Sequence, residues 1–421
     1  MHQIHTLNNG LRILMVPVQT FQSVSVGFFV GVGSRYEDEA QSGMSHFIEH
    51  MLFKGSTKRP SSRVIAEAIE GIGGVSNAYT SQDVTVYYAK VAASQVSTAI
   101  DVLADMVRNP LFKPADIEKE RMVIGEEINM AFDMPDSWVS NLSDQLLWPN
   151  HPLGWGIAGT HQSLTGINTD TLLPFFDSSY HPENVLVAIG GAFNPDEVLA
   201  QVSSLLGEWR PAARPTFSTA PASQTQPVSN IEHRPIEQGH LCLAMPALSR
   251  LDPDRYALAV LNTVLGDGMS SRLFLNIRED KGLAYAVDSG LNFLQDTGSL
   301  VVYAGVDSDR AVLAVRAILD ELERLRNEPV PAEELYKAKE YIKGRMVLGL
   351  EDSYSQAAWI AYQMLFMDTI KSPEEVIAAY DSVTVDDVLA VAQRVIVPAS
   401  YTLAGVGPFG QGDELSKLLY N

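Results

Sequence analysis

The sequence predicts an α+β protein built from two similar halves. The apolar pattern alternates between the two-residue period of strands and the longer period of helices. A segment rich in proline divides the chain at 210–230, and features that precede it recur after it. With 421 residues, 46% of them hydrophobic, each half is long enough to bury a core. We expect domains at 1–209 and 231–421, each a mostly antiparallel sheet packed with helices, joined by a linker.

Hydrophobic periodicity and turn residues place the elements of the first half. Asn9 and Gly10 favour a hairpin turn because both positions tolerate a positive φ. The expected strands are 4–7, 11–18, 24–32, 75–80, 84–91 and 184–190. The expected helices are 43–54, 62–72, 94–108, 114–131, 169–179 and 194–206, with a loop-rich stretch before the fifth of them.

The second half repeats features of the first. A Pro-Ala-acidic start of a long helix at 114–116 recurs at 331–333. The Ser-Ser-Arg segment at 61–63 recurs at 270–272. The helix that begins near Thr169 recurs after Thr384, followed by a strand at 401–405. Because the matches keep their order, we interpret the halves as two versions of one structural unit.

Charge and cysteine content exclude several classes of protein. The formal charge of −21 counts against a nucleic-acid partner, which requires clustered Lys and Arg. The single cysteine, Cys242, forms no internal disulfide and is expected to be a buried, inert thiol. The first residues do not resemble a signal peptide, and the apolar stretches are shorter than the ~20 residues that cross a bilayer. We expect a cytoplasmic protein without a membrane partner.

The first expected helix contains a candidate metal motif. His46 and His50 are four residues apart, so both imidazoles lie on one helical face and can share a metal ion. Glu49 follows His46 by three residues, close enough to act as general base toward a water that zinc brings to a pKa of ~7. The order is the inverse of the His-Glu-x-x-His motif. The alternative is a chance grouping, although the apolar neighbours Phe47 and Ile48 predict a buried helix whose imidazoles need partners.

A catalytic zinc usually has a third protein ligand, and the second long helix offers Glu120, Glu126 and Glu127. Glu120 and Glu127 are seven residues apart, on one stripe with Val123 and Ile124, which we expect to face inward. Glu126 is rotated by ~100° from Glu127 and is expected to face solvent or a neighbouring helix. Periodicity leaves open that all three are ordinary surface carboxylates.

The chain resembles the pitrilysin/insulinase-type zinc peptidases, in the branch that is similar to mitochondrial processing peptidase. The resemblance rests on the inverted motif within 43–55 and on the segments 73–80, 120–128, 151–160 and 268–285. It implies one Zn²⁺ per chain, with Glu127 as the third ligand beside His46 and His50. It also implies Glu49 as general base and Glu120 as a carboxylate that supports the metal site.

The resemblance further implies residues that bind substrate. Asn77, Ala78 and Tyr79 match an open edge strand that pairs with an extended peptide, which gives affinity with little sequence preference. Arg278 and Tyr285 match a pair that reaches from the second half to the active site, where it would hold the substrate carbonyl and the oxyanion.

In the second half, Asn262, Gly266 and Gly344 stand near the repeat equivalents of the metal ligands, and none of them can bind zinc. The resemblance implies that the halves face each other as a clam-like chamber. The expected activity is a zinc-dependent endopeptidase that hydrolyses peptides or unstructured protein segments. We expect a homodimer, with a heterodimer containing a metal-free paralogue as the alternative. Relatives also serve as non-catalytic core subunits of a respiratory complex, a role that an intact metal motif disfavours.

Overall fold

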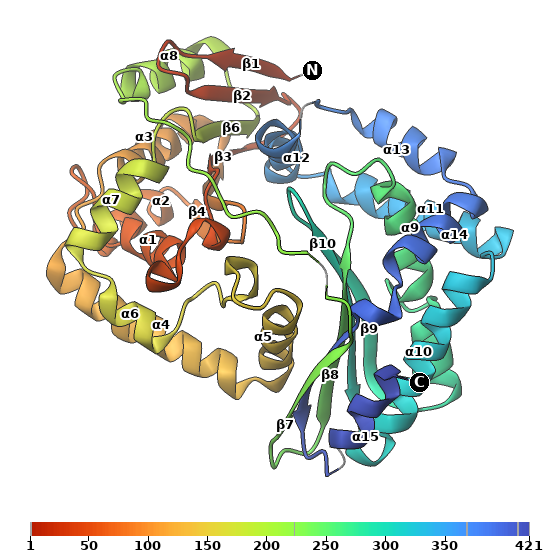
Figure 1. Ribbon diagram of the computed structural model, residues 1–421. Helices are drawn as coiled ribbons and strands as arrows, with labels where there is room; N and C mark the ends of the chain where they lie inside the picture. The colour runs from red at the N-terminus through yellow and green to blue at the C-terminus, as the bar shows by residue number, and fades with distance from the viewer. Residues whose placement is uncertain (1, 223, 368, 411, 421) are drawn as a thin grey trace. The chain divides into compact units, whose positions relative to one another are not determined.

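The computed structural model describes residues 2–222, 224–367, 369–410 and 412–420 and has an α+β fold with two mixed sheets (Figure 1). The chain forms two compact units, each of which is described by itself. The first unit comprises the described residues of Met1–Asn129, Trp155–Ser218 and Leu348–Ile370. The second comprises those of Met130–Gly154, Thr219–Val347 and Lys371–Asn421.

The first unit contains a sheet of six strands in the order β1-β2-β6-β3-β5-β4. The strands are β1 (Gln3–Thr6), β2 (Arg12–Pro17), β3 (Ser23–Val30), β4 (Val75–Thr80), β5 (Thr85–Ala92) and β6 (Val185–Gly191). β2 and β6 are parallel, and the other neighbouring pairs are antiparallel. The predicted hairpin is confirmed, because Gly10 has a φ of 87° and Leu7 N donates to Leu11 O.

Helices cover both faces of this sheet (Figure 1). They are α1 (Met44–Leu52), α2 (Ser62–Glu70), α3 (Val96–Arg108), α4 (Pro114–Asp133, which continues into the second unit), α6 (His161–Gly166), α7 (Thr169–Ser179), α8 (Pro195–Leu206) and α12 (Ser353–Phe366). One core packs Phe28 and Tyr87 of the sheet against Phe47 of α1. On the other face, Leu14 and Phe29 belong to a core with α12.

The second unit repeats the strand order of the first. Its strands are β7 (Val228–His233), β8 (Gly239–Ala247), β9 (Ala284–Phe293), β10 (Gly298–Val306) and β11 (Thr402–Gly407). They lie in the order β7-β11-β8-β10-β9, with β7 and β11 parallel and the other pairs antiparallel. This matches β2-β6-β3-β5-β4 in order and direction, so the predicted internal repeat is confirmed.

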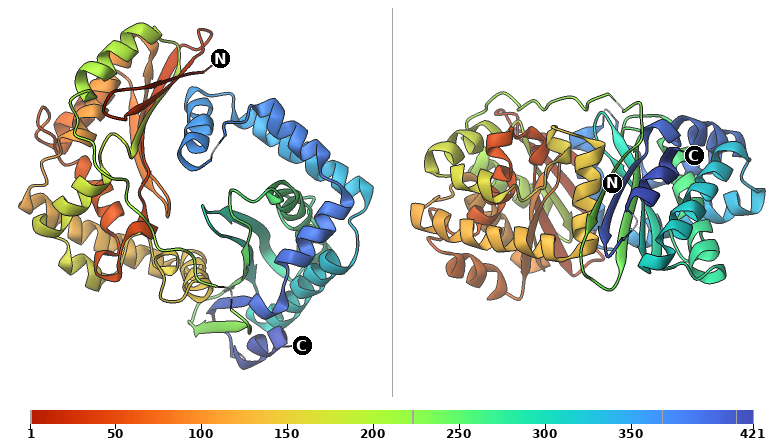
Figure 2. Two further views of the ribbon diagram at one scale, coloured as in Figure 1. Left: turned by 45° about the horizontal axis from the view of Figure 1, so that its top comes forward. Right: turned by 60° about the horizontal axis from the view of Figure 1, so that its bottom comes forward.

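The helices of the second unit also lie on both faces of its sheet (Figure 2). They are α5 (Pro135–Leu147), α9 (Arg255–Leu265), α10 (Ala311–Asn327), α11 (Ala332–Gly349), α13 (Pro373–Ser382), α14 (Val385–Val395) and α15 (Gly412–Lys417). Val139 and Leu142 of α5 form a core with Cys242 and Val406. Burial raises the pKa of Cys242 to about 12. The residue is therefore a buried, inert thiol, as the sequence predicted.

Each unit contains a helix from the opposite half of the sequence. α12 follows the proline-rich segment, yet it packs on β2, β3 and β6 of the first sheet (Figure 1). α5 precedes that segment, yet it packs on β8 and β11 of the second. The compact units therefore do not follow the sequence division at 209 and 231. The physical reason is that each sheet has two apolar faces, and each face must be covered.

The structure differs from the sequence prediction at two further places. The stretch expected to be loop-rich contains α5 and α6, and Pro135 at the first turn of α5 was an available helix signal. The expected linker extends to residue 230, but residues 228–230 belong to β7 and pair with β11. No helix among the described residues is long and apolar enough to cross a membrane.

Candidate metal centre

The N-terminus of α1 is held by a buried carboxylate. Glu37 accepts hydrogen bonds from the backbone N–H groups of Gly43 (2.8 Å) and Ser45 (2.7 Å). Burial raises the pKa of Glu37 to about 8, although the two backbone hydrogen bonds act in the opposite direction. Gly43 has a φ of 92° and comes so close to Ala158 that a Cβ would lie 2.6 Å from its carbonyl oxygen. These contacts fix the start of the helix that carries His46 and His50.

We expect Glu37→Ala to lower the free energy of unfolding by about 2 kcal/mol, because two buried N–H groups lose their acceptor. Urea unfolding monitored by circular dichroism measures this. Glu39→Ala is the matched control, since Glu39 is exposed on the neighbouring 3₁₀ turn. Equal unfolding free energies for the two variants would contradict the anchoring role of Glu37.

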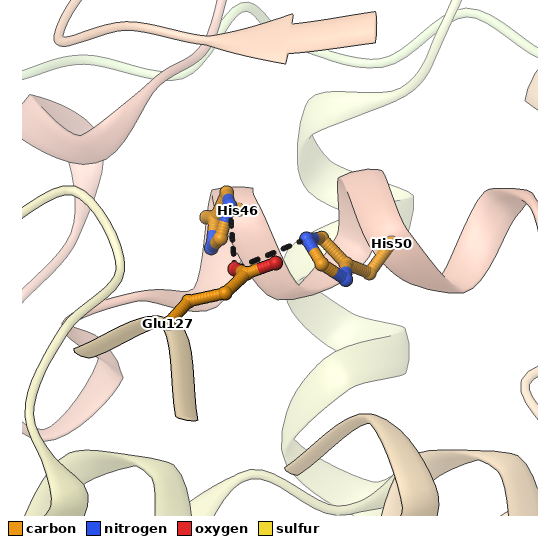
Figure 3. Close-up of side chains that lie close together, drawn as sticks. All are labelled: His46, His50 and Glu127. Carbon is orange, nitrogen blue, oxygen red and sulfur yellow. Dashed lines mark ion pairs between the residues drawn. The ribbon is translucent and has the colours of Figure 1, made fainter. Parts of the chain in front are cut away.

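Three side chains converge beside α1 (Figure 3). Glu127 of α4 places Oε2 at 3.7 Å from Nε2 of His46 and at 3.5 Å from Nε2 of His50. The candidate ligand atoms of the three residues all lie within 4.8 Å of one another. Among the residues that the structure describes, this is the only such group of three His, Cys, Asp or Glu side chains.

The two distances from Oε2 of Glu127, 3.5 and 3.7 Å, are close to those expected around a zinc ion. Zinc–ligand distances of about 2.0–2.2 Å in a tetrahedron put neighbouring ligand atoms about 3.3–3.6 Å apart. Two imidazoles and one carboxylate are also a donor set of catalytic zinc sites. Because Nδ1 of His50 lies 3.1 Å from Oε2 of Glu120, the proton of His50 belongs on Nδ1 and its Nε2 is available to a metal.

The surroundings favour neutral imidazole at His46 and a charged carboxylate at Glu120. Burial, with a smaller effect of His50, lowers the pKa of His46 to about 4. Burial would raise the pKa of Glu120, but hydrogen bonds from His50 and from Lys54, whose Nζ is 2.6 Å from Oε1, lower it overall. Burial opposes a charge on His50 as well, yet the carboxylates of Glu120, Glu127 and Glu49 raise its pKa.

Glu49 lies outside the group of ligand atoms and has its own partner. The hydroxyl of Thr80, on β4, donates to Oε2 of Glu49 over 2.6 Å. Burial raises the pKa of Glu49, and the Thr80 hydrogen bond only partly offsets this. A half-buried carboxylate with raised basicity, fixed one turn from His46, has the properties of a general base.

The predicted substrate strand, β4, is an edge strand that pairs with β5 alone among the described strands. Ser81 N donates to Val84 O at the hairpin, and from there hydrogen-bonded and non-bonded pairs alternate along the register. The main-chain groups of Ser76, Ala78 and Thr80 therefore point to the open edge. The side-chain oxygen of Asn77 currently accepts the N–H of Ala78.

Arg278 and Tyr285 belong to the second unit. Arg278 lies in a π-helical turn, Phe274–Asp280, 4.8 Å above the Phe274 ring, and Tyr285 on β9 is 62% exposed. Their role at the metal centre stays a prediction. Asn262, which stands near the repeat equivalent of His46, is buried and accepts a hydrogen bond from Ser289 (2.8 Å). An uncharged hydrogen-bonded pair therefore occupies this position in the second half.

The comparisons with known proteins decide the family. "Insulinase (Peptidase family M16)" matches residues 12–161, and "Peptidase M16 inactive domain" matches residues 166–342. Uncharacterized zinc protease YmxG of Bacillus subtilis is 36% identical over 406 residues, which cover 96% of this chain and 98% of YmxG. The chain belongs to the insulinase-type M16 peptidase family. An uncharacterized zinc protease of Mycobacterium leprae is 35% identical over 418 residues, with 98% of this M16 chain and 93% of the relative covered.

Solved structures confirm the fold of this M16 chain. A protease from Helicobacter pylori has a TM-score of 0.90 at 23% identity, covering 97% of this chain and 99% of that one. A chain of complex III2 from Candida albicans has a TM-score of 0.84 at 18% identity, covering 99% of both. Since a protease and a chain of complex III2 share the fold at these identities, the fold alone does not establish catalysis.

Sequence reasoning did not assign every contact of this M16 site. Thr80 and Lys54 lie in segments that carry the family resemblance, but the sequence assigned them no role. Nothing in the sequence near Glu37 indicated its contact with the start of α1. The prediction that Val123 faces inward on α4 was wrong, because its side chain is exposed. Ile124 and Glu120 are buried, as expected. Glu126 is exposed, as its rotation from Glu127 predicted.

Proposed function

We propose that the chain is a zinc-dependent endopeptidase for peptides or unstructured protein segments. The observation that carries the proposal is the convergence of His46, His50 and Glu127, with Glu49 beside them and outside the ligand group. The zinc-protease names of the full-length relatives support the metal and the reaction class.

In this proposal, His46, His50 and Glu127 hold the ion, and Glu120 orients the ring of His50. The ion, when bound, supplies Lewis-acid polarisation and lowers the pKa of a water. Glu49 takes one proton from the attacking water while the water oxygen forms a bond to the scissile carbonyl carbon. The same carboxyl then gives this proton to the leaving nitrogen when the C–N bond breaks. Thr80 keeps Glu49 in place during both transfers.

The edge of β4 supports an extended peptide as substrate. The outward main-chain groups of Ser76, Ala78 and Thr80 can pair with a peptide strand, as in β-augmentation. Such pairing reads backbone rather than side chains, which suits unfolded segments of varied sequence. An incoming strand must displace the side chain of Asn77 from the N–H of Ala78.

We further propose that Arg278 and Tyr285 stabilise the oxyanion. Arg278→Ala and Tyr285→Phe are then each expected to lower kcat about 10²-fold with zinc content unchanged, since each removes a donor to developing charge. Steady-state kinetics on one fluorogenic peptide, with metal analysis, measures this. Tyr336→Phe is the control because Tyr336 is 67% exposed on α11 of the same unit. Wild-type kcat in both variants would remove the pair from the mechanism.

The direct test of the function is incubation of the chain, purified alone, with a set of unstructured peptides, with and without a chelator. We expect internal cleavage that stops on chelation and returns with zinc. Failure to cleave any peptide with one zinc ion bound per chain would overturn self-sufficient activity.

For the working assembly we propose a homodimer in the cytoplasm. The single cysteine suits a reducing compartment, and the presence of both Arg278 and Tyr285 suits a chain that acts without a second type of subunit. The mass from size-exclusion chromatography with light scattering tests the dimer. If cleavage begins only when a metal-free paralogue is added, the heterodimer replaces it.

A further inference from the structure

The face of β4 that lies away from Glu49 is attached to α12. The hydroxyl of Tyr79 is 3.0 Å from the hydroxyl of Tyr354 and 2.6 Å from that of Tyr362. Tyr354 and Tyr362 come from α12, which follows β4 by more than 270 residues in sequence. All three rings are half-buried, within the first unit.

α12 is a firm support because it lies unusually close to the sheet. A Cβ on Gly190 of β6 would stand only 2.3 Å from the carbonyl oxygen of Ser353, so this approach requires glycine. The hydroxyls of Ser353 and Ser25 are 2.8 Å apart and buried. Asp352 caps the helix by accepting the N–H groups of Tyr354 and Ser355.

Ring packing fixes where the two α12 hydroxyls point. The ring of Tyr354 lies 4.4 Å from that of Tyr88 and 6.5 Å from that of Phe29, centre to centre. The ring of Tyr362 meets Phe29 edge-on at 5.7 Å. Neither ring can turn without losing these contacts. The hydroxyls of Tyr354 and Tyr362 are therefore held in position to hydrogen-bond with the hydroxyl of Tyr79.

Two successive residues of β4 are thus held on opposite faces. Side chains alternate along a strand, so Tyr79 reaches α12 while Thr80 reaches Glu49. An edge strand is paired on one side only, and its open side is free to fray. The tyrosine contact restrains that strand at the position where the outward groups of Ala78 and Thr80 would meet a peptide.

We propose that Tyr354 and Tyr362 are positioning residues for peptide binding, which hold β4 in the extended form that a substrate strand pairs with. This inference rests on the proposed peptidase function. Without the two hydroxyls, β4 is less ordered before binding, and the peptide must order it. The effect falls on peptides long enough to pair with several β4 residues, because a short peptide makes few strand contacts.

The test is the Tyr354→Phe/Tyr362→Phe double variant of the full chain, which keeps both rings. For a long unstructured peptide we expect KM to rise about five- to tenfold, with kcat within about twofold and zinc content unchanged. For a peptide too short to span β4 we expect a KM change below about twofold. Amide hydrogen exchange should show lost protection at Asn77 and Tyr79, the β4 residues bonded to β5.

Tyr88→Phe is the matched control, because it removes a hydroxyl of the same ring cluster that has no hydrogen bond to a described residue. Its KM and exchange pattern should equal those of the wild type. An unchanged KM in the double variant, or an equal fall in kcat for long and short peptides, would overturn the positioning role. Wild-type protein that cleaves nothing would instead refute the proposed function, whereas the exchange measurement would still report on the restraint of β4.

Discussion

Glu49→Gln is expected to lower kcat for peptide hydrolysis about 10³-fold while the protein stays folded and keeps its zinc. Glutamine has nearly the shape of glutamate and can still accept the Thr80 hydrogen bond, so the local structure should be preserved. It cannot take a proton from water, and the proposed transfer to the leaving nitrogen is lost with it. Steady-state hydrolysis of one fluorogenic peptide, with zinc measured in the same sample, gives both quantities.

Glu70→Gln, an exposed carboxylate at the end of α2, controls for the loss of one negative charge and should keep wild-type kcat. The informative failure is a Glu49→Gln protein with near-normal kcat, which would show that another group takes the proton. Loss of zinc in that variant would instead place Glu49 among the ligands, against the geometry of the site.

Glu127→Gln is expected to weaken zinc binding at least about 100-fold, a loss that matches or exceeds that caused by removing an outer-shell partner of a metal ligand. The substitution removes the anionic oxygen that lies 3.7 Å from Nε2 of His46 and 3.5 Å from Nε2 of His50. Competition with a chromophoric chelator measures the affinity, and activity should fall in proportion to bound zinc.

Glu126→Gln is the matched control, because it makes the same chemical change one residue earlier on the same helix. Glu126 is exposed, outside the ligand group, and its variant should bind zinc as the wild type does. Equal zinc affinity in the two variants would exclude Glu127 as a ligand and return the choice to Glu120, whose carboxylate now contacts His50 and Lys54.

Much of the candidate site could be predicted because its signals are local. The four-residue spacing of His46 and His50 fixes their common face on any helix, and the seven-residue spacing of Glu120 and Glu127 limits the third ligand to few carboxylates. The sequence predicted that the two sheets resemble each other, because the same elements recur in the same order in both halves. It did not predict the order of the strands within either sheet. Periodicity could not choose Glu127 over Glu120, because that choice depends on how α4 is rotated against α1.

What could not be predicted depends on contacts between distant parts of the chain. The apolar pattern of α12 shows that the helix is covered, but nothing in it says which of two similar sheets covers it. Tyr79 was expected to bind substrate, which stays a prediction, but the contact of its side chain with two tyrosines of α12 could not be predicted because those residues are more than 270 positions away. Glu37 was missed for a related reason: its carboxylate acts on backbone N–H groups, which leave no mark in the sequence.

The reciprocal placement of α5 and α12 has a consequence for how such a chain can evolve. After a duplication, two independent copies can be separated again, and either can be lost. Here each copy completes its sheet with a helix encoded in the other, so the gene cannot be shortened to one copy without exposing an apolar sheet face. Cleavage of the backbone in 210–222 would likewise leave two interlocked fragments rather than two free domains. The second copy could therefore lose its metal ligands and still be retained.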